Sequence, residues 1–177
     1  MSMLKGKKCI LRPLRLEDAK ILSEIANDIE VRDYLSNVFP YTEIMEEDFI
    51  KSLSSQKVPV DIVFGIEASG KLIGTVGIHR INWTSRNGYL GIAIFDKDFW
   101  NRGIGTEATS LILKYAFEYL NLHKILLEVY EYNKRAIRVY EKLGFRREGV
   151  LRKNHYLKGE YHDVIVMGIL KEEYFEL

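Results

Sequence analysis

The chain has 177 residues, of which 47% are hydrophobic and 29% charged, and its 26 basic and 25 acidic side chains leave a formal net charge of +1. This length suits one domain with a sizeable core, so residues 1–177 are expected to form a single domain. The balanced charge gives no indication of a polyanion-binding surface, and a nucleic-acid partner is therefore not expected.

The sequence shows no sign of a disulfide, a metal site or a membrane segment. Cys9 is the single cysteine, which excludes an internal disulfide and a cysteine-based cluster, and the four histidines lack the spacing of metal ligands. Residues 1–14 contain no apolar stretch of signal-peptide length, and no window approaches the roughly 20 apolar residues of a membrane helix. We therefore expect a cytoplasmic protein that uses no metal and contacts no membrane.

The first third of the chain predicts one strand and three helices. Residues 7–14 predict the strand, and residues 16–28 carry apolar side chains on one helical face. Residues 29–35 predict a second, short helix. Thr42 is the expected N-cap of a third helix, which has acidic residues in its first turn and extends to about Leu53.

Three strands and two turns are predicted next. Residues 60–68, 71–81 and 88–95 are rich in β-branched and aromatic side chains. The turn signals Ser69-Gly70 and Asn87-Gly88 separate these strands. They are therefore expected to form an antiparallel meander.

The second half of the chain alternates helices and strands. Apolar side chains from Ala108 to Leu120, Tyr119 among them, repeat with the period of a helix. Residues 124–131 predict a strand, and residues 133–143 predict a helix capped by Asn133. Residues 145–157 and 160–170 predict the two strands of a closing hairpin. This order predicts a mixed α/β (α+β) fold whose mostly antiparallel sheet has about seven strands.

The stretch FWNRGIGTEA, residues 99–108, places two glycines directly before a helix. A helix N-terminus has unpaired N–H groups and a partial positive charge, and glycine lacks the side chain that would hold a ligand away. Gly103 and Gly105 therefore suit a pyrophosphate on the amides of residues 102–107, with Arg102 adding a charged contact. The alternative is a tight loop that binds no ligand, in which glycine is needed only because it can adopt the backbone torsion angles of the turn.

GIGTEA also matches the G-x-G-x-x-A form of the dinucleotide fingerprint, so a nicotinamide-dependent enzyme is one alternative. In that fingerprint the glycines directly follow a strand, whereas residues 96–101 intervene here. About a hundred residues precede the loop, and no second βαβ half follows it. No Walker lysine follows the glycines, which argues against a nucleoside triphosphatase.

Two sequence blocks together resemble the GCN5-related N-acetyltransferase (GNAT) superfamily. Residues 90–117 are similar to its acetyl-CoA pyrophosphate motif, [Q/R]-x-x-G-x-[G/A], in which Gly103 and Gly105 match and Trp100 stands at the first position. The block LEVYEYNKRAIRVYEKLGF is similar to the next motif of the family. The order of elements matches over essentially the whole chain, nearest the ribosomal-protein N-terminal acetyltransferases and the spermidine N-acetyltransferases.

The resemblance implies a GNAT-type twisted sheet in which the strands over residues 88–95 and 124–131 splay apart, because a pantetheine arm cannot pass between fully paired strands. Acetyl-CoA, the expected cofactor, lies in that gap. Its pantetheine amides are expected to pair with the backbone of Ala93, Ile94 and Phe95. Its pyrophosphate is expected on the loop residues Asn101, Arg102, Gly103, Ile104, Gly105 and Thr106.

Tyr140 is the predicted general acid, because the resemblance places a tyrosine here beside the cofactor sulfur. A phenol with a pKa near ~10 can protonate the thiolate left by a thiol with a pKa near ~8.5. The alternative is a core aromatic side chain. Asn133 resembles the family asparagine that contacts the pantetheine arm, and it also suits a plain N-cap.

Glu128 is the predicted general base, acting on the amine directly or through a water. It shares a strand face with Leu126 and Tyr130, opposite Ile125 and Val129, and a carboxylate in so apolar a run should be partly desolvated, which raises its pKa. N-terminal acetyltransferases have a glutamate in this place. The alternative is a glutamate that faces water or pairs with an arginine.

We expect direct acetyl transfer from acetyl-CoA to a primary amine, either the N-terminal amine of a protein or a small molecule such as a polyamine. The family also leads us to expect a homodimer. A non-catalytic acyl-CoA-binding domain is the alternative from another class, and the presence of both Glu128 and Tyr140 argues against it.

Overall fold

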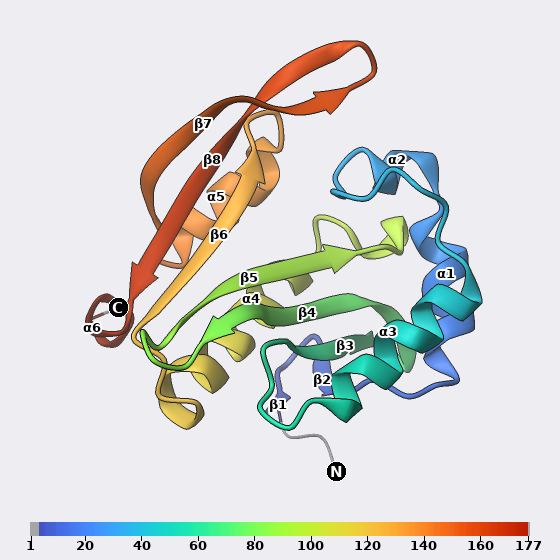
Figure 1. The fold of residues 1–177 in the computed structure, drawn as a ribbon, viewed down its shortest axis with the longest axis horizontal. Coiled ribbons are helices and arrows are strands. Elements are labelled where there is room, and N and C mark those ends of the chain that lie inside the picture. Colours follow the sequence, from blue (N-terminus) through green and yellow to red (C-terminus); the bar gives the residue numbers. More distant parts are fainter. Residues whose placement is uncertain (1–3, 177) are drawn as a thin grey trace.

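One eight-stranded sheet organises the structure, a computed structural model that describes residues 4–176 (Figure 1). The strands are β1 (Leu4–Lys5), β2 (Ile10–Pro13), β3 (Ile62–Ala68), β4 (Lys71–Asn82), β5 (Asn87–Ile94), β6 (Lys124–Tyr130), β7 (Arg146–Leu157) and β8 (Glu160–Leu170). The helices are α1 (Asp18–Ala26), α2 (Ile29–Arg32), α3 (Glu43–Ser55), α4 (Ile104–Lys114), α5 (Lys134–Lys142) and α6 (Lys171–Phe175). A 3-10 turn, Lys97–Phe99, precedes α4, and a π-helical turn, Tyr115–Tyr119, extends it.

The strands follow one another across the sheet in the order β1-β2-β3-β4-β5-β6-β8-β7. Every neighbouring pair is antiparallel except β5 and β6, which are parallel. The predicted mixed, mostly antiparallel sheet is confirmed. The sheet has one strand more than predicted. The extra strand is the two-residue β1, which precedes the strand predicted over residues 7–14 and pairs with β2.

β5 and β6 part after a short stretch of pairing. Residues Asn87–Tyr89 of β5 pair with Lys124–Leu126 of β6. β5 then continues beside β4 as far as Ile94, and β6 continues beside β8 as far as Tyr130. Figure 1 shows the two strands diverging as a V, and the splayed strand pair expected from the sequence is confirmed.

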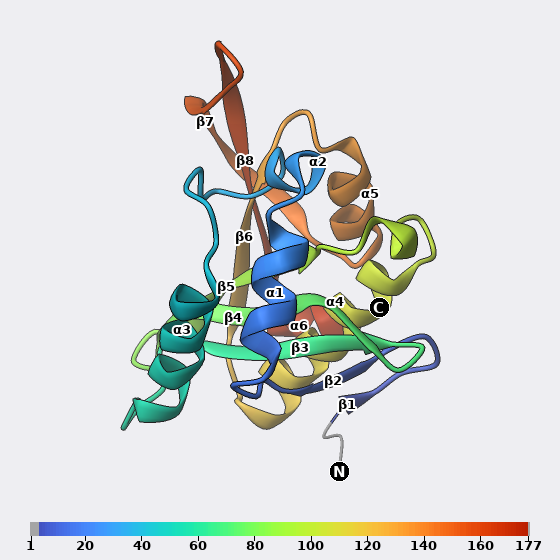
Figure 2. The same ribbon diagram turned by 90° about the vertical axis from the view of Figure 1, so that its right-hand side faces the viewer.

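Helices cover both faces of the sheet. Figure 2 shows α4 and α5 on one side and α3 on the other, with α1 packed beside α3. The apolar stripe of α4 contributes buried side chains such as Ala108, Ile112 and Ala116 to the core. Tyr119 is 66% exposed, contrary to the predicted stripe, because the π-helical turn shifts the helical phase and buries Phe117. Within residues 4–176, no helix combines the length and the apolar character needed to cross a membrane.

The predicted turn at Asn87-Gly88 is wrong. The chain turns over residues 83–86, and β5 already begins at Asn87. A side chain on Gly88 would come within 2.5 Å of Ile78 Cγ2 on β4, so this glycine permits close packing inside the sheet. The predicted turn at Ser69-Gly70 is confirmed, with positive φ at both residues.

Three further predicted boundaries are confirmed, whereas the first strand and the first two helices are shorter than predicted, at Ile10–Pro13, Asp18–Ala26 and Ile29–Arg32. At the start of α3, Thr42 Oγ1 accepts a hydrogen bond from the Met45 N–H at 3.2 Å. Gly144, which follows α5, has a φ of 89°. Lys158 and Gly159 also have positive φ values, in the turn that joins β7 to β8.

A buried ion pair attaches α1 to the sheet. The carboxylate of Asp18, which is 2% exposed, accepts hydrogen bonds from Arg12 Nη1 and Nη2 at 2.8 and 2.9 Å and from the Arg15 N–H at 2.7 Å. Arg12 Nε also donates to Glu67 of β3 at 2.8 Å. Burial alone would raise the pKa of Asp18, but these donors hold it below its usual value.

Replacing Asp18 with asparagine should lower the free energy of unfolding by roughly 3 kcal/mol, because the Arg12 guanidinium would keep its buried position, lose its buried charged partner and retain only the partly exposed Glu67. Urea unfolding of Asp18→Asn, with the exposed Glu17→Gln as a control, measures the difference. Because the pKa of Asp18 is lowered in the folded state, its contribution should be present at neutral pH and lost as the pH falls through that lowered pKa. Equal unfolding free energies for the two variants would contradict this assignment.

Candidate active site

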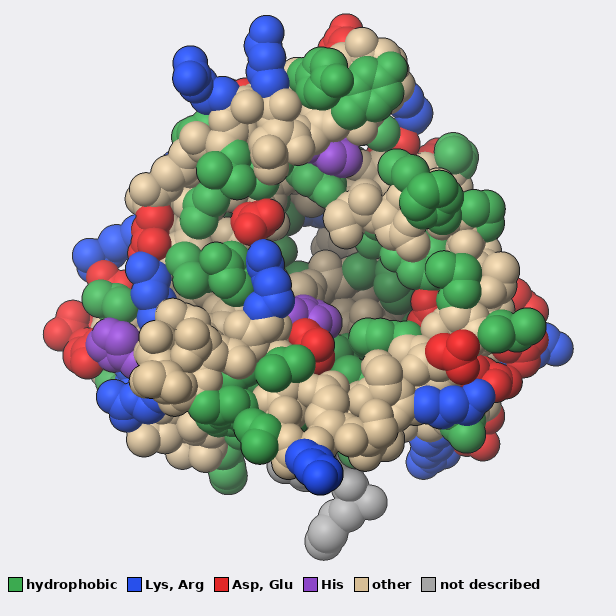
Figure 3. Space-filling view, viewed as in Figure 1, with side chains coloured by type: hydrophobic (Ala, Val, Ile, Leu, Met, Phe, Trp, Pro, Cys, Tyr) green, Lys and Arg blue, Asp and Glu red, His purple; other side chains and the backbone are tan. Residues whose placement is uncertain are grey.

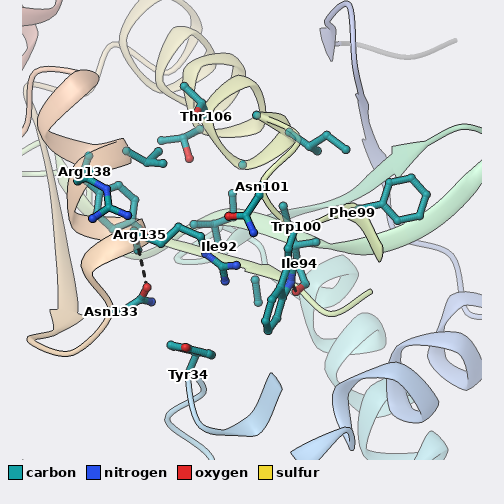
Figure 4. A pocket seen from close by; sticks show the side chains of 18 of the residues that line it. Tyr34, Ile92, Ile94, Phe99, Trp100, Asn101, Thr106, Asn133, Arg135 and Arg138 are labelled. Atoms are coloured by element: carbon teal, nitrogen blue, oxygen red, sulfur yellow. Dashed lines mark hydrogen bonds between the residues drawn. The ribbon is translucent and has the colours of Figure 1, made fainter. Parts of the chain in front are cut away.

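A cavity of about 360 Å³ opens where β5 and β6 part, and it is called the first cavity. Residues from β5, the first turn of α4, α5 and the segment after α2 line it (Figure 4). Its lining includes nine residues predicted from the sequence: Ala93, Ile94, Asn101, Gly103, Ile104, Gly105, Thr106, Asn133 and Tyr140. Arg102 does not line it; its guanidinium lies 5.3 Å from the centre of the Phe99 ring, so the predicted Arg102 contact is not part of this cavity.

The two glycines of the loop have different structural roles. Gly103 has a φ of +76°, which a residue with a side chain rarely adopts, so the loop requires a glycine here. Gly105 lies in the first turn of α4 without a positive φ, and a Cβ there would meet only Ile94 Cδ1, at 3.6 Å. A glycine inside a helix costs roughly 1 kcal/mol relative to alanine. The backbone therefore does not require Gly105, and its missing side chain leaves open space between α4 and β5.

The first cavity combines free N–H groups, cations and an unpartnered hydroxyl. α4 begins at Ile104, so the amides of its first turn have no acceptor within the helix. Arg135, Arg138 and Lys142 of α5 line the same cavity. Thr109, another lining residue, has a buried Oγ1 with no hydrogen-bond partner in the described part of the chain. This set of donors fits an anionic ligand such as the pyrophosphate of coenzyme A.

Sequence reasoning did not identify the three cations of α5. Their spacing of three and four residues places them on one helical face, which is the signal that was available. The sequence alone does not say toward which part of the molecule that face points. The position of α5 against the gap between β5 and β6 supplies the answer.

Trp100, which stands where the family motif has glutamine or arginine, braces the end of β5. Its Nε1 donates a hydrogen bond to Ile94 O at 2.7 Å. The Arg135 guanidinium lies 4.2 Å from the centre of the indole ring, and the Tyr34 ring meets the indole nearly at a right angle, with 6.0 Å between ring centres. Figure 4 shows these side chains at the wall of the first cavity. Trp100 thus holds an arginine in place through a cation–π contact.

Glu107 fastens the N-terminal segment to the glycine loop. The carboxylate of this residue, in the first turn of α4, accepts hydrogen bonds from the N–H groups of Lys7, Lys8 and Cys9 at 2.7–2.9 Å. Lys8 Nζ also donates to Arg102 O at 2.8 Å. Desolvation alone would raise the pKa of Glu107, but the backbone donors hold it below its usual value.

A second cavity, of about 650 Å³, meets the first. Residues of α3, β4, β5 and β6 and of the segment after α2 line it. Six residues border both cavities: Tyr34, Leu35, Ile92, Ala93, Asn133 and Tyr140. Figure 3 shows the molecule hollowed at its centre. A ligand in each cavity would therefore reach the same tyrosine.

Tyr140 combines the two roles considered for it. Its side chain is 9% exposed and belongs to the main core, where its ring packs against Phe145 with 5.8 Å between ring centres. It also borders both cavities. Desolvation raises the pKa of the Tyr140 phenol to about 12, so the hydroxyl is protonated at physiological pH.

Glu128 lies in the second cavity, and its environment differs from the prediction. The alternation along β6 is confirmed, with Ile125 and Val129 buried on the opposite face. The Glu128 side chain, however, is 40% exposed, and its Oε1 lies 3.4 Å from Arg80 Nη2. The expectation of a desolvated carboxylate is therefore wrong. Because β6 has no partner on this edge beyond Leu126, the face that carries Glu128 borders the second cavity.

The free edge of β5 offers one of the predicted backbone donors. The Phe95 N–H already donates to Ile73 O at 2.9 Å, so this amide is satisfied within the sheet, contrary to the prediction. Backbone groups alternate in direction along a strand, so Ala93 faces β4 as Phe95 does, and Ile94 faces the gap. The Ile94 carbonyl already accepts a hydrogen bond from Trp100 Nε1. Of the predicted backbone donors, the Ile94 N–H is therefore the one available to a ligand.

Asn133 caps α5, as the sequence predicted. Its Oδ1 accepts a hydrogen bond from the Ala136 N–H at 3.2 Å, drawn as a dashed line in Figure 4. Its side chain also borders both cavities. The predicted contact with the pantetheine arm is compatible with the cap, because a carboxamide has donors left after its oxygen has accepted this bond.

Comparisons with known proteins found similar chains. The family model of the acetyltransferase (GNAT) domain matches residues 8–146. The spermidine N(1)-acetyltransferase of Escherichia coli K12 is 32% identical over 166 residues, which cover 93% of this chain and 87% of that one. The putative ribosomal N-acetyltransferase YdaF of Bacillus subtilis is 33% identical over 114 residues, 62% of each chain.

A solved structure is similar over nearly the whole chain. The spermidine N-acetyltransferase of Vibrio cholerae, in complex with CoA and spermine, gives a TM-score of 0.87 at 28% identity and covers 96% of this chain and 99% of that one. The domain matched by the family model contains the glycine loop. The match therefore places the loop inside an acetyltransferase domain, which argues against the dinucleotide-binding unit considered above.

Replacing Gly105 with glutamate should weaken the binding of coenzyme A by more than about tenfold, because the side chain would fill the space facing Ile94 and bring a negative charge to the phosphate site. Calorimetric titration with coenzyme A measures the change. Ser110→Glu, at an exposed position of α4, adds the same charge outside the cavity and should leave the affinity unchanged. Thermal unfolding should show no loss of stability for either variant. A folded Gly105→Glu protein with the parent's affinity would refute an anion site at this turn.

Proposed function

The chain belongs to the acetyltransferase (GNAT) family and transfers the acetyl group of acetyl-coenzyme A to an amine, and we propose that the transfer takes place at Tyr140, where the two cavities meet. That junction is the observation that carries the proposal. One cavity suits the anionic cofactor, and the other reaches the same hydroxyl from the opposite side of the gap. The cofactor and the amine can therefore approach each other only where β5 and β6 have parted.

The cofactor occupies the first cavity in this proposal. Its pyrophosphate lies on the amides of residues 103–106 at the start of α4, with Arg135 and Arg138 beside it. The pantetheine arm runs along the free edge of β5 and past Asn133. There the Ile94 N–H donates to one of its carbonyl groups or polarises the thioester.

Acetyl transfer requires two proton transfers, which we assign to Glu128 and Tyr140. The acceptor must first lose a proton to solvent, because alkyl amines have pKa values near ~10 and only the neutral nitrogen is a nucleophile. That nitrogen attacks the thioester carbonyl carbon; as the C–N bond forms, it releases a second proton through water to Glu128. The C–S bond breaks, and the thiolate takes the hydroxyl proton of Tyr140. Solvent then returns a proton to Tyr140 and takes the proton from Glu128, which restores both groups. The products are the N-acetylated amine and the free thiol of coenzyme A.

The burial of Tyr140 affects how readily it gives up that proton. A phenol with a pKa of about 12 is a weaker acid in water than a thiol with a pKa near ~8.5. The thiolate forms in the same desolvated junction, however, so the same cause raises the pKa of the thiol. Donor and acceptor are therefore better matched than their values in water suggest.

Direct transfer requires no covalent intermediate on the enzyme. Burial and the neighbouring Glu107 raise the pKa of the Cys9 thiol to about 12, so it stays protonated and is a poor nucleophile. Cys9 also lines neither cavity. Both observations support attack by the amine on the bound thioester itself.

A primary amine is the acceptor we propose. The relatives named for spermidine and for ribosomal proteins support two kinds of primary amine, a polyamine and the N-terminal amine of a protein. The second cavity is the site proposed for either, since Glu128 borders it and Tyr140 borders both cavities.

Tyr140→Phe should lower kcat by about 10²–10⁴, because it removes the proton donor while keeping the ring that packs in the core. Calorimetry should give the parent's affinity for coenzyme A. In the parent, kcat should not fall between about pH 8 and pH 10, because the phenol, with a pKa of about 12, stays protonated there. Tyr119→Phe, at an exposed tyrosine, is the control. A loss smaller than about tenfold would mean that another group protonates the thiolate.

Glu128→Gln should lower kcat at neutral pH by about tenfold or more, because the nitrogen loses its proton acceptor. The deficit should shrink as the pH rises toward the pKa of the amine, since hydroxide then takes over. Glu141→Gln, which removes another half-exposed glutamate paired with an arginine, is the matched control. A deficit of the same size at every pH would point to a structural role for Glu128.

A further inference from the structure

We propose that the acceptor is a singly charged primary amine on an apolar, aromatic body, such as 2-phenylethylamine, and not a polyamine. The inference rests on the proposed function, because it takes the second cavity as the acceptor site. The relatives named for spermidine make a polyamine the comparison that matters. A ligand with several ammonium groups requires several free carboxylates and a polar lining, and the second cavity, within residues 4–176, has neither.

The second cavity has a largely apolar lining. Side chains of this kind include Tyr41, Met45, Phe49 and Val63. Met45 and Phe49, both on α3, are 46% and 37% exposed, and Figure 3 shows hydrophobic side chains beside the central hollow. A ligand with an apolar body would cover such side chains and gain roughly 25 cal/mol for each Å² removed from water. Extended polyamines have much less apolar surface to offer between their charges.

The ionisable groups of the second cavity suit one ammonium. Its lining contains two acidic side chains, Glu46 and Glu128, and two basic ones, His79 and Arg80. Glu128 is already paired with Arg80 at 3.4 Å, and His79 Nδ1 lies 3.1 Å from Asp61. Among the described residues that line the cavity, Glu46 is thus the one carboxylate without an ion pair.

Glu46 has the environment of a carboxylate that gains from a cationic ligand. It is half-buried on α3, and desolvation raises its pKa. The incoming amine, still an ammonium, would form a charge-assisted hydrogen bond with Glu46 before it loses its proton to solvent and attacks the thioester. A second or third ammonium would find no free carboxylate, and Arg80, held 3.7 Å from the centre of the Tyr89 ring, would repel it. An unpaired charge in a partly desolvated site costs several kcal/mol.

Contacts at Asp33 tie the β7–β8 hairpin to the segment that precedes Tyr34. Lys158 Nζ, in the turn of that hairpin, lies 2.6 Å from Asp33 Oδ2, and the Tyr132 hydroxyl donates to Asp33 O at 2.5 Å. Asp33 directly precedes Tyr34, which borders both cavities. Figure 1 shows the hairpin arching toward α2.

The test measures acetyl transfer by the full chain with acetyl-CoA, followed as thiol release. The acceptors are 2-phenylethylamine, butylamine, spermidine and a short peptide with a free N-terminal amine on an apolar first residue. We expect kcat/KM for 2-phenylethylamine to exceed each of the other values by about tenfold or more. Butylamine has the same charge and less apolar surface, so the comparison with it isolates the contribution of the ring.

Two variants assign this preference to the second cavity. Glu46→Gln should raise KM for 2-phenylethylamine by about tenfold with little change in kcat, because it removes the partner of the ammonium. Phe49→Ala should abolish most of the preference over butylamine. Glu43→Gln, exposed on α3, and Phe175→Ala, exposed on α6, are the matched controls and should leave both constants unchanged.

Equal or higher kcat/KM with spermidine or with the peptide would overturn the inference, as would parental KM values in both cavity variants. So would a protein that binds coenzyme A but does not acetylate 2-phenylethylamine. Failure of the proposed function is distinguishable, because coenzyme A would then not bind in calorimetry, or Tyr140→Phe would transfer acetyl at the parent's rate.

Discussion

The parting of β5 and β6 is the constraint on which the rest of the structure depends. Neighbouring strands normally satisfy each other's N–H and C=O groups, so a strand edge that lacks its partner leaves such groups to be satisfied in another way. Trp100 meets part of this need within the chain, since its Nε1 donates to Ile94 O. The Ile94 N–H is left for a ligand that carries amides of its own, and the pantetheine arm of the cofactor is such a ligand.

Both cavities follow from the same parting. β5 stays with β4 and β6 stays with β8, so side chains of α5 and of the segment after α2 line the gap between them. Tyr140 lies in this angle, packed against Phe145 and bordering both cavities. The core role and the proposed catalytic role of this tyrosine are therefore compatible. Packing in the core fixes the ring, and its position between the cavities would give the hydroxyl access to both substrates.

Most of the fold could be predicted from the sequence because its signals are local: apolar periodicity, caps and glycine turns. The prediction failed where tertiary packing overrode a local signal, as at Gly88, or where one π-helical turn changed the phase, as at Tyr119. In the site, motif resemblance predicted which residues lie near the gap, Tyr140 among them. It did not predict their surroundings, since Arg80, which pairs with Glu128, lies 48 positions away in the chain and on another strand.

The charge at the start of α4 looks unsuited to a phosphate site until its partners are considered. Glu107 places a carboxylate in the first turn, where it would repel a pyrophosphate. Its oxygens, however, face the N–H groups of Lys7, Lys8 and Cys9, and the Lys8 ammonium lies against the same loop, on Arg102 O. The positive end of the helix thus serves two anions on different sides. One belongs to the chain and holds the N-terminal strands in place. In the proposed function the other is the cofactor pyrophosphate, in the space that the missing side chain of the second loop glycine leaves beside β5.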